Sequence, residues 1–370
     1  MNIPSPYRLH LLGELARQLK ERGIDFRCHF MARGHADRPA SWLNPKIDFP
    51  HTYWRDFGFG QYHFNPGLIL KMIFSPPEWM VCGSSFDTFT GLGVQLLGRA
   101  KVKMCWLEGN TKTPGQLGGI KGWIKRVVMG RCKYAPVPGS DAAKYVGLHQ
   151  ARTTRRMPRP VILPNLVDEK RFSSVFPKED RDLFRREAFG ADDGQRVCII
   201  PARLEPVKGL IPFLDQVEAR MLDGWKLVVM GQGPLKNEIV AKIAERHLGD
   251  FVKILDYVPY GEMPKYYASA DLFLLPSLYD PNPLSVIEAL HSGLPVAVSV
   301  QAGNVEEAVE ENGWVLHVMA RDSFKFELEQ VFSSGQERLR AMGALSRARA
   351  NLFWNTRGAV DRFIREVLPI

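Results

Sequence analysis

Two carboxylates flank one turn in the second half of the chain. Asp280 follows the apolar run from Leu272 to Leu275, and Glu288 lies eight positions later in a second apolar segment. The first run predicts a short buried strand, and residues 285–292 predict a helix. We therefore expect Asp280 at the carboxyl end of a strand, where open α/β sheets bind ligands, and Glu288 about one turn inside the helix.

The start of that helix favours an anion. The backbone N–H groups of Leu284, Ser285 and Val286 have no partner within the helix, and the helix dipole is positive at this end. Phosphate groups commonly bind at such helix starts. The carboxylates can accept hydrogen bonds from sugar hydroxyls, and the helix start can bind a diphosphate. Together they suit a sugar attached to a diphosphate.

Two cations occupy another strand-to-helix turn. Arg203 and Lys208 follow the apolar run from Val197 to Pro201, and Gly209 comes directly after them. Arginine can bind a phosphate through two parallel hydrogen bonds, and lysine adds a point charge. The turn is therefore suited to stabilising a leaving diphosphate.

Further loops follow the next two expected strands. Gly231 and Gly233 end the strand 226–230, and small residues let the backbone approach a ligand closely. Tyr257 and Val258 follow the strand 252–255, and we expect them at the edge of a pocket for a nucleotide base.

The first half offers fewer candidates. Glu108 follows the expected strand 102–106 and precedes a glycine, so it should lie at a carboxyl strand end. A plain exposed loop glutamate explains it equally well. Tyr7 and Arg8 lie at the first strand-to-helix loop, where Arg8 could contact an acceptor or a diphosphate.

Strands and helices alternate along the whole chain, which indicates parallel α/β sheets. A length of 370 residues favours about two domains. We expect an N-terminal Rossmann-like domain at 1–170, a connector at 171–194, a nucleotide-sugar-binding Rossmann-like domain at 195–352, and a final helix at 353–370.

The order of Arg203, Lys208, the glycine loop and the two acids resembles the retaining glycosyltransferases of family 4, with their Glu-x7-Glu signature. The resemblance implies the GT-B fold, in which two Rossmann-like domains face each other across a cleft and the final helix crosses back to the first domain. It also implies that the first acid contacts the donor sugar and the second the nucleotide ribose. This chain has Asp280 and Pro283 where the family has glutamate and glycine, and Glu108 where many members have histidine.

The function implied by the resemblance is sugar transfer, with retained anomeric configuration, from a nucleotide diphosphate sugar to a hydroxyl of a glycan or lipid-linked acceptor. It fits bacterial polysaccharide or lipopolysaccharide synthesis and needs neither a cofactor nor a metal. Two alternatives stay open. One is a GT-B protein that binds a nucleotide sugar but has impaired catalysis, and the other is an epimerase or phosphorylase on the same fold.

The net charge of +9 is unevenly distributed, because residues 1–178 are strongly basic and the remainder is mildly acidic. A basic surface can meet an anionic membrane, a nucleic acid or an anionic substrate, and no nucleic-acid motif is present. Residues 121–133 form either a basic amphipathic helix that lies on lipid or an ordinary helix that covers a sheet. No signal peptide or membrane-spanning run appears, so we expect a cytoplasmic protein that is peripheral on the membrane.

The five cysteines are widely spaced, and no metal-binding motif accompanies them, so they are expected to be reduced core thiols. The segment 32–66 reads as an irregular excursion with no assigned role. Residues 1–6 are too short and proline-rich for the central first strand of a doubly wound sheet. We therefore expect a strand of about five to eight apolar residues to precede Met1 in the native protein.

Overall fold

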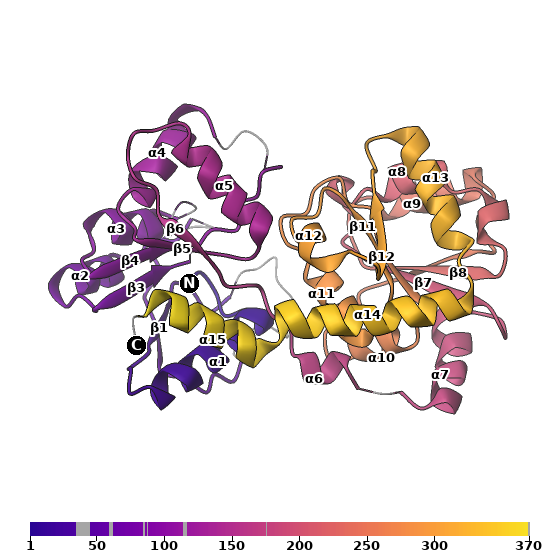
Figure 1. Ribbon diagram of the computed structural model, residues 1–370, viewed down its shortest axis with the longest axis horizontal. Helices are drawn as coiled ribbons and strands as arrows, with labels where there is room; N and C mark the ends of the chain where they lie inside the picture. Colours follow the sequence, from indigo (N-terminus) through magenta and orange to yellow (C-terminus); the bar gives the residue numbers. More distant parts are fainter. Residues whose placement is uncertain are drawn as a thin grey trace. The chain divides into compact units, whose positions relative to one another are not determined.

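The computed structural model describes residues 1–34, 45–58, 62–83, 86, 88–113, 117–174 and 176–368. The chain forms two compact units (Figure 1). The first contains Met1–Val167 and Thr356–Ile370, and the second contains Asp168–Asn355. The segment 171–194, which the sequence suggested as a separate connector, lies within the second unit.

A six-stranded parallel sheet forms the centre of the second unit. Its strand order is β12-β11-β10-β7-β8-β9. The strands are β7 (Arg196–Pro201), β8 (Trp225–Met230), β9 (Val252–Leu255), β10 (Leu272–Leu275), β11 (Val296–Ser299) and β12 (Gly313–Leu316). The chain builds outward from β7 to β9 and then returns to the other side of β7. The topological switch point therefore lies between β7 and β10, and this is where open α/β sheets bind ligands.

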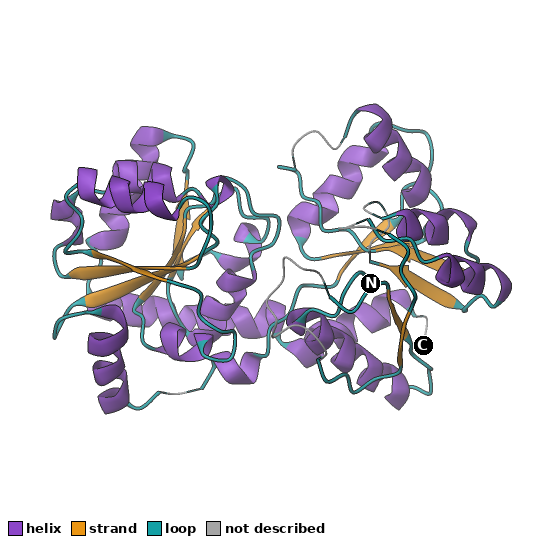
Figure 2. Ribbon diagram, turned by 180° about the vertical axis from the view of Figure 1, so that it is seen from behind, coloured by secondary structure: helices purple, strands orange, loops and turns teal. Residues whose placement is uncertain are grey.

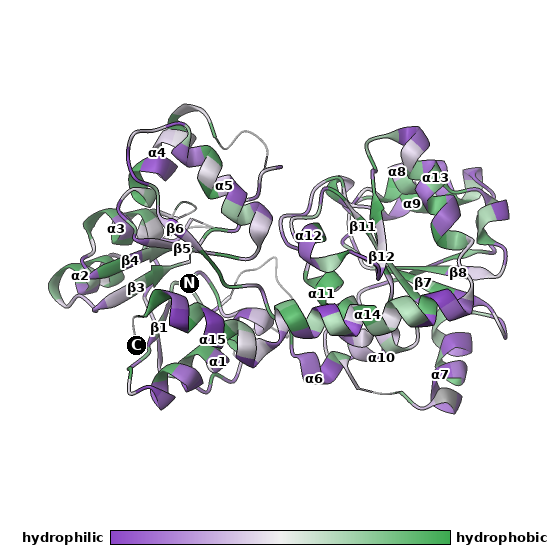
Figure 3. Cartoon of the chain, in the orientation of Figure 1, coloured by the Kyte–Doolittle hydropathy of each residue, from purple (hydrophilic) through white to green (hydrophobic). Residues whose placement is uncertain are grey.

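Helices cover both faces of this sheet (Figure 2). One layer holds α8 (Leu210–Gln216), α9 (Lys236–Glu245) and α13 (Arg321–Phe332), and the other holds α10 (Met263–Ala268), α11 (Leu284–Ser292) and α14 (Gln336–Trp354). Short helical turns complete the unit: α6 (Glu169–Phe172), α7 (Lys178–Phe184), η2 (Arg185–Phe189), η3 (Pro206–Lys208), η4 (Ala219–Leu222) and α12 (Val305–Ala308). Because both faces are covered, the inner strands are hydrophobic along their length (Figure 3).

The connector helices join the second unit through one buried carboxylate. Asp271, at the start of β10, accepts hydrogen bonds from Arg181 at 2.9 Å and Arg185 at 2.7 Å, and from the backbone N–H of Val197 at 2.8 Å. A buried carboxylate needs such partners to offset its desolvation. This explains why a charged segment that resembles a linker belongs to the folded unit.

The first unit contains two separate parallel sheets. One has the order β3-β4-β5-β6, from β3 (Trp79–Cys82), β4 (Val102–Cys105), β5 (Tyr134–Val137) and β6 (Arg159–Ile162). The other pairs β1 (Cys28–Phe30) with β2 (His51–Tyr53). The prediction that 32–66 is irregular is wrong at β2, where the sequence His-Thr-Tyr carries no apolar alternation. Residues 35–44 and 59–61 of that segment lie outside the described residues.

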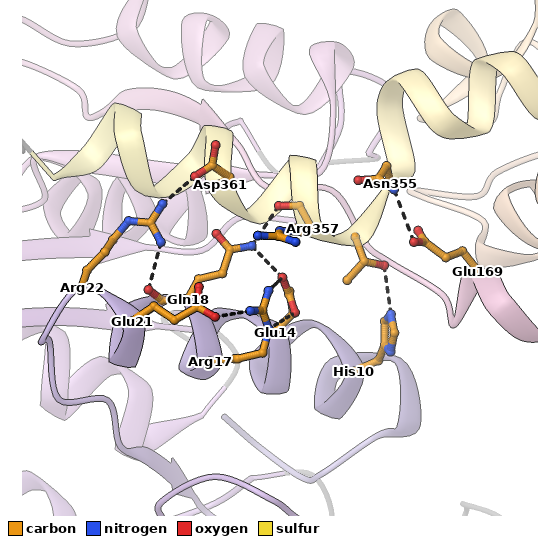
Figure 4. A network of polar contacts seen from close by, with 11 residues as sticks. His10, Glu14, Arg17, Gln18, Glu21, Arg22, Glu169, Asn355, Arg357 and Asp361 are labelled. Atoms are coloured by element: carbon orange, nitrogen blue, oxygen red, sulfur yellow. Dashed lines mark hydrogen bonds and ion pairs between the residues drawn. The ribbon is translucent and has the colours of Figure 1, made fainter.

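The beginning and the end of the chain meet in the first unit. The first helix, α1 (Pro6–Glu21), packs against the last, α15 (Thr356–Val367) (Figure 4). His10 and Thr356 share a hydrogen bond of 3.0 Å, the Gln18 amide donates to the Arg357 carbonyl at 2.9 Å, and Arg22 pairs with Asp361. The remaining helices are α2 (Pro66–Phe74), α3 (Phe89–Leu97), α4 (Gly119–Met129) and α5 (Ser140–Gln150).

The prediction of a parallel α/β fold with two Rossmann-like units is confirmed by these sheets. All five cysteines are buried, and none of them forms a disulfide bond. None of the described helices is both long and apolar enough to cross a lipid bilayer.

Candidate active site

An ion pair lies at the switch point of the second unit. Lys208, which follows β7, places its Nζ 2.5 Å from Oδ2 of Asp280, which follows β10. The two side chains are only 15% and 9% exposed. The sequence suggested the two residues separately, and the parallel sheet brings them together across 72 positions of the chain. Mutual neutralisation lets both charges stay in a poorly hydrated site.

Tight backbone packing holds this pair in place. Gly209 follows Lys208 with φ at +68°, and a Cβ there would lie 2.0 Å from the Pro276 carbonyl oxygen. The backbone N–H of Leu278 donates to the Val207 carbonyl at 2.9 Å. The loop after β7 is therefore fixed against the loop after β10, and only glycine fits at the contact.

Arg203 lies on the same β7 loop but points into solvent. Its side chain is 67% exposed and pairs with Glu205 at 2.6 Å. The loop is supported by Gly231 and Gly233, where a Cβ would meet the carbonyl oxygens of Ala202 at 2.1 Å and Leu204 at 2.4 Å. The two glycines thus let the β7 and β8 loops pack together.

The start of α11 lies after Asp280. Leu284 and Ser285 are partly exposed and Val286 is buried, and no side chain caps the helix start. Asn304 is 1% exposed, and its Nδ2 donates to the Pro283 carbonyl at 3.1 Å. Asp280 also joins this loop, because its carbonyl accepts from the Gly303 N–H at 2.9 Å. These hydrogen bonds hold the start of α11, Asp280 and the loop after β11 in fixed positions relative to one another.

Glu288 is buried inside α11, 8% exposed, beside two tyrosines. The Tyr267 hydroxyl donates to Oε2 of Glu288 at 2.8 Å. Burial raises the pKa of Glu288 from 4.5 to about 7, although the hydrogen bond from Tyr267 opposes this rise. The pKa of Tyr260 is raised by burial and by the nearby Glu288 charge.

The sequence reasoning missed Tyr267 and Tyr260. Phe172 packs edge-on against Tyr267, with ring centroids 5.5 Å apart. The centroid of the Phe172 ring also lies 6.1 Å from that of the Tyr260 ring. These aromatic rings form the hydrophobic surroundings that desolvate Glu288. Tyr257 and Val258 follow β9 in the loop that the sequence indicated, where Tyr257 is 47% exposed and Val258 is partly exposed.

The first unit brings its own candidates together. Arg8 forms an ion pair with Glu108, although 100 positions separate them. The Arg8 guanidinium lies 4.2 Å from the centre of the Trp106 ring and 5.4 Å from that of Tyr7. Burial lowers the pKa of Arg8, and its Nη1 has no hydrogen-bond partner among the described residues. The half-exposed Glu108 carboxylate and the Tyr7 ring thus belong to one polar cluster of the first unit.

Histidine, cysteine, aspartate and glutamate side chains do not gather into a metal-binding group of three or more anywhere in the described ranges. The acids described above are paired with lysine, arginine or tyrosine instead.

Comparisons with known proteins identify the second unit most clearly. Residues 182–348 match the family model described as glycosyl transferases group 1. The amylovoran biosynthesis glycosyltransferase AmsD of Erwinia amylovora is 31% identical over 158 residues, 42% of each chain. The lipopolysaccharide core biosynthesis mannosyltransferase LpsB of Rhizobium meliloti is 28% identical over 208 residues, 53% of this chain and 56% of LpsB. The matches therefore span about half the length of these relatives.

Solved structures match over the whole chain. Anabaena HepE, crystallised with UDP and glucose, superposes with a TM-score of 0.75 over 99% of both chains at 16% identity. WaaG, described as a glycosyltransferase involved in lipopolysaccharide biosynthesis, gives a TM-score of 0.69 over 98% of both chains at 15% identity. At such identities the likeness shows the shared GT-B fold.

Proposed function

We propose that this chain, whose second unit belongs to the glycosyl transferases group 1, transfers a sugar from a nucleotide diphosphate sugar to an acceptor hydroxyl. The observation that carries the proposal is the Lys208–Asp280 pair, which lies at the switch point of the sheet next to the free start of α11. Cation, carboxylate and helix start together match the charge pattern of a sugar diphosphate.

The second unit binds the donor in this proposal. The departing diphosphate is stabilised by Lys208, by the exposed Arg203 and by the N–H groups of Leu284, Ser285 and Val286. Asp280 orients the sugar hydroxyls, and its pairing with Lys208 reduces the repulsion between its carboxylate and the phosphates. Glu288 binds the ribose. Because its pKa is raised to about 7, Glu288 exists near neutral pH both as a carboxylate, which only accepts hydrogen bonds, and as a carboxylic acid, which can also donate one.

The reaction proceeds with retention of configuration in this proposal. The acceptor hydroxyl attacks the anomeric carbon on the face from which the diphosphate leaves, and the leaving phosphate oxygen takes the hydroxyl proton. The bond from the sugar to the diphosphate breaks as the bond to the acceptor forms. Such a route needs no protein base near the anomeric carbon, and positively charged groups supply the electrostatic stabilisation.

The acceptor is proposed to be a glycan or a lipid-linked hydroxyl that contacts the first unit. The relatives AmsD and LpsB carry names from amylovoran and lipopolysaccharide core biosynthesis. In the first unit, Arg8, Glu108 and Tyr7 form a polar cluster with an unsatisfied guanidinium nitrogen. This unit has 27 Lys and Arg against 12 Asp and Glu, a balance of +15. Such a charge attracts an anionic membrane surface.

One observation favours a second candidate, a protein that binds a nucleotide sugar without turning it over. Asp280 is the shorter acid, and Lys208 already engages its carboxylate. If the pair persisted with donor bound, Asp280 could not reach the sugar hydroxyls. Detectable turnover separates the two candidates.

The test is a panel of UDP-, GDP- and dTDP-linked sugars incubated with the purified chain, with mass detection of released nucleotide diphosphate and free sugar. We expect slow hydrolysis of one donor by the wild-type chain and none by Lys208→Ala. Binding of a donor without any hydrolysis would favour the inactive binding protein, and absence of binding to the whole panel would contradict both candidates.

The same assay tests whether the reaction needs a metal. We expect unchanged hydrolysis in excess chelator, because Lys208, Arg203 and the start of α11 already supply positive charge to the diphosphate. Loss of activity in chelator that Mg²⁺ or Mn²⁺ restores would contradict this part of the proposal.

A further inference from the structure

The loop between β2 and α2 is rich in aromatic residues. Its sequence, residues 54–65, contains five Phe, Tyr and Trp residues but no leucine, isoleucine, valine or methionine. In the described parts of this loop, Phe57, Tyr62 and Phe64 are between 42% and 56% exposed. Phe89, the first residue of α3, is 59% exposed, and its ring centre lies 6.4 Å from that of Tyr62. We call these four exposed residues the aromatic cluster.

A carboxylate holds the described parts of this loop together. Oδ1 of Asp56 accepts hydrogen bonds from the backbone N–H groups of Gly58 and Phe64, each at 2.9 Å. Oδ2 of Asp56 is hydrogen-bonded to the ring of His63, which is buried. Gly58 lies so close to Tyr62 that a Cβ would come within 1.9 Å of the Tyr62 carbonyl oxygen. The two sides of the loop are thus tied to each other around Asp56.

Asn65 ties the same loop to the end of β1 and to α3. It is fully buried, and its Nδ2 donates to the carbonyls of Met31 and Arg55, both at 3.0 Å. Its Oδ1 accepts from the Thr90 hydroxyl at 2.9 Å. A buried amide with these bonds made resists movement, because breaking them would leave polar groups unpaired. The aromatic cluster is therefore presented on a preformed surface, which lowers the entropic cost of binding a ligand.

Two arginines lie beside the cluster without an acidic partner. The Arg55 guanidinium is 4.8 Å from the centre of the Phe57 ring, and that of Arg33 is 4.6 Å from the centre of the Tyr53 ring. Both arginines are exposed, and in the ranges that the structure describes neither forms an ion pair with a carboxylate. A guanidinium over a ring keeps the N–H donors at its edge available, and two of them match a carboxylate. The two arginines therefore suit an anionic group next to an aromatic surface.

The location and composition of the loop indicate a saccharide. Arg33 and Arg55 follow the carboxyl ends of β1 and β2, which pair in parallel, and open α/β sheets bind ligands at this edge. The described residues of the loop are not helical, whereas segments that lie on lipid are typically amphipathic helices with leucine among their apolar residues. Aromatic rings offer flat apolar surfaces with polar neighbours. They suit a ligand that combines C–H faces with polar edges, which is the character of a pyranose ring.

We propose that the aromatic cluster, with Arg33 and Arg55, is a subsite for an acidic saccharide of the acceptor glycan. The C–H face of a pyranose packs on an exposed ring, and its carboxylate pairs with an arginine. The inference rests on the proposed function, because it names the class of glycan that the first unit binds as acceptor. It also gives a role to part of the segment 32–66, for which the sequence alone indicated none.

The experiment measures binding of oligosaccharides to the purified chain by isothermal titration calorimetry, without a donor. The acidic probes are tetrasaccharides of hyaluronan, alginate and polygalacturonate, and the neutral probes are tetrasaccharides of chitin, cellulose and starch. We expect at least one acidic probe to bind about tenfold or more tightly than every neutral probe, and its affinity to fall as salt is added.

Substitutions separate the contribution of the rings from that of the charges. Phe57→Ala should weaken binding of the best acidic probe about fivefold or more, whereas Phe57→Tyr, which keeps the ring, should stay within about twofold of the wild type. Arg33→Gln combined with Arg55→Gln should reduce the affinity for the acidic probe to that for the neutral probes, because it removes charge and keeps the rings. Phe326→Ala, an exposed ring on the second unit, is the control and should change nothing. All these positions are exposed, so the variants should fold as the wild type does.

Equal binding of acidic and neutral probes, or binding of none, would overturn the proposal, and so would an acidic preference that survives loss of both arginines. If Phe57→Ala weakened binding to anionic phospholipid vesicles and left saccharide binding intact, the loop would be a lipid contact and the proposal wrong. The measurement needs no turnover. A chain that binds the acidic probe but hydrolyses no donor would contradict the proposed function alone. A chain that hydrolyses a donor but shows no acidic preference would contradict only the subsite.

Discussion

The two units are built from the same kinds of element but differ in how their strands are joined. In the second, six strands form one sheet, and a cluster of buried side chains on part of that unit extends from Cys198 to Met342. In the first, six strands form two sheets, and the buried side chains that pack on the β4–β5 region are separate from those around α2 and α3. The continuous sheet of the second unit thus carries one extended cluster, whereas these two clusters of the first unit are smaller and local.

The units also differ in charge. The first carries a balance of +15, and the second, with 22 Lys and Arg against 28 Asp and Glu, carries −6. Both expose large apolar side chains, such as Phe74 at 79% and Trp123 at 60% in the first unit and Met319 at 72% in the second. The sequence left open whether 121–133 covers a sheet or lies on lipid. In α4, Trp123 is exposed, whereas Val128 and Met129 are buried. The comparison teaches that the two units, built from the same kinds of element, carry opposite charge balances.

The largest expected effect tests the difference in packing. Leu274→Ala in β10, which is fully buried, should lower the free energy of unfolding of the second unit by about 3–5 kcal/mol. Leu68→Ala, which is 4% exposed but lines a cavity of the first unit, should cost about 1–2 kcal/mol, because that side chain already lacks partners on one side. Hydrogen exchange in a urea series gives each unit its own value. Equal losses would show that the first unit is packed as fully as the second.

The second-largest effect is expected from breaking the Lys208–Asp280 ion pair. Lys208→Ala should lower turnover of the best donor about 10²-fold or more, the scale for removing one preoriented charge-stabilising group. It also leaves the Asp280 carboxylate without its partner, so the second unit should melt earlier. Adding Asp280→Asn should restore the melting temperature and not the turnover.

Lys226→Ala is the matched control for this variant, because Lys226 is a partly exposed lysine near the amino end of β8, at the opposite end of the strand from the site. It should change turnover less than threefold. If turnover by Lys208→Ala stayed within threefold of the wild-type value, the diphosphate would have to bind elsewhere.

A smaller effect concerns the pH dependence of stability. Since the pKa of folded Glu288 is raised from 4.5 to about 7, the unfolded chain loses this proton between those pH values while the folded unit keeps it. The second unit should therefore lose stability as pH rises from about 4.5 to 7, by up to about 3 kcal/mol, and then level off. Glu288→Gln, which cannot ionise, should remove this slope, whereas the exposed Glu337→Gln should keep it. Parallel curves for Glu288→Gln and wild type from pH 5 to 8 would refute the burial argument.

The smallest expected effect concerns the surface of the first unit. Trp123→Ser should weaken binding to anionic phospholipid vesicles about three- to tenfold, because it removes one exposed ring beside the basic residues of α4. Phe326→Ser, an equally exposed ring on the second unit, should have no effect. Wild-type binding should also fall with salt, since charges are screened beyond about 10 Å at 0.1 M. Equal sedimentation with neutral and anionic vesicles would argue against a membrane role.

Much of the fold could be predicted from the sequence because parallel strands covered on both faces are apolar throughout. β10 is such a run. β9 and β3 are mostly apolar but only partly buried, and the predicted bounds of all three strands agree with the structure. β2 was not predicted because His51–Tyr53 has no such apolar pattern. This segment forms a strand because it pairs with β1. Local pattern therefore identifies strands whose own residues make the core, and misses those that depend on a neighbour.

The candidate site was predictable where its residues follow strands in a fixed order. Lys208 and Asp280 could be assigned to one edge of a sheet before their contact was known. Tyr267 could not, because it lies in an aromatic stretch of α10 that reads as ordinary core, and only the fold brings its hydroxyl to Glu288. The contact of Arg8 with Glu108 likewise depends on packing within the first unit, which no spacing in the sequence reveals.

The packing of α15 against α1 has a consequence for biosynthesis. A ribosome releases the amino end first, and the whole of the second unit is complete before Thr356–Ile370 emerges. The partners of His10, Gln18 and Arg22 are therefore made only after the whole second unit. The first unit begins to be translated before the second but is finished after it, and the nascent chain must hold α1 without α15 until that helix emerges.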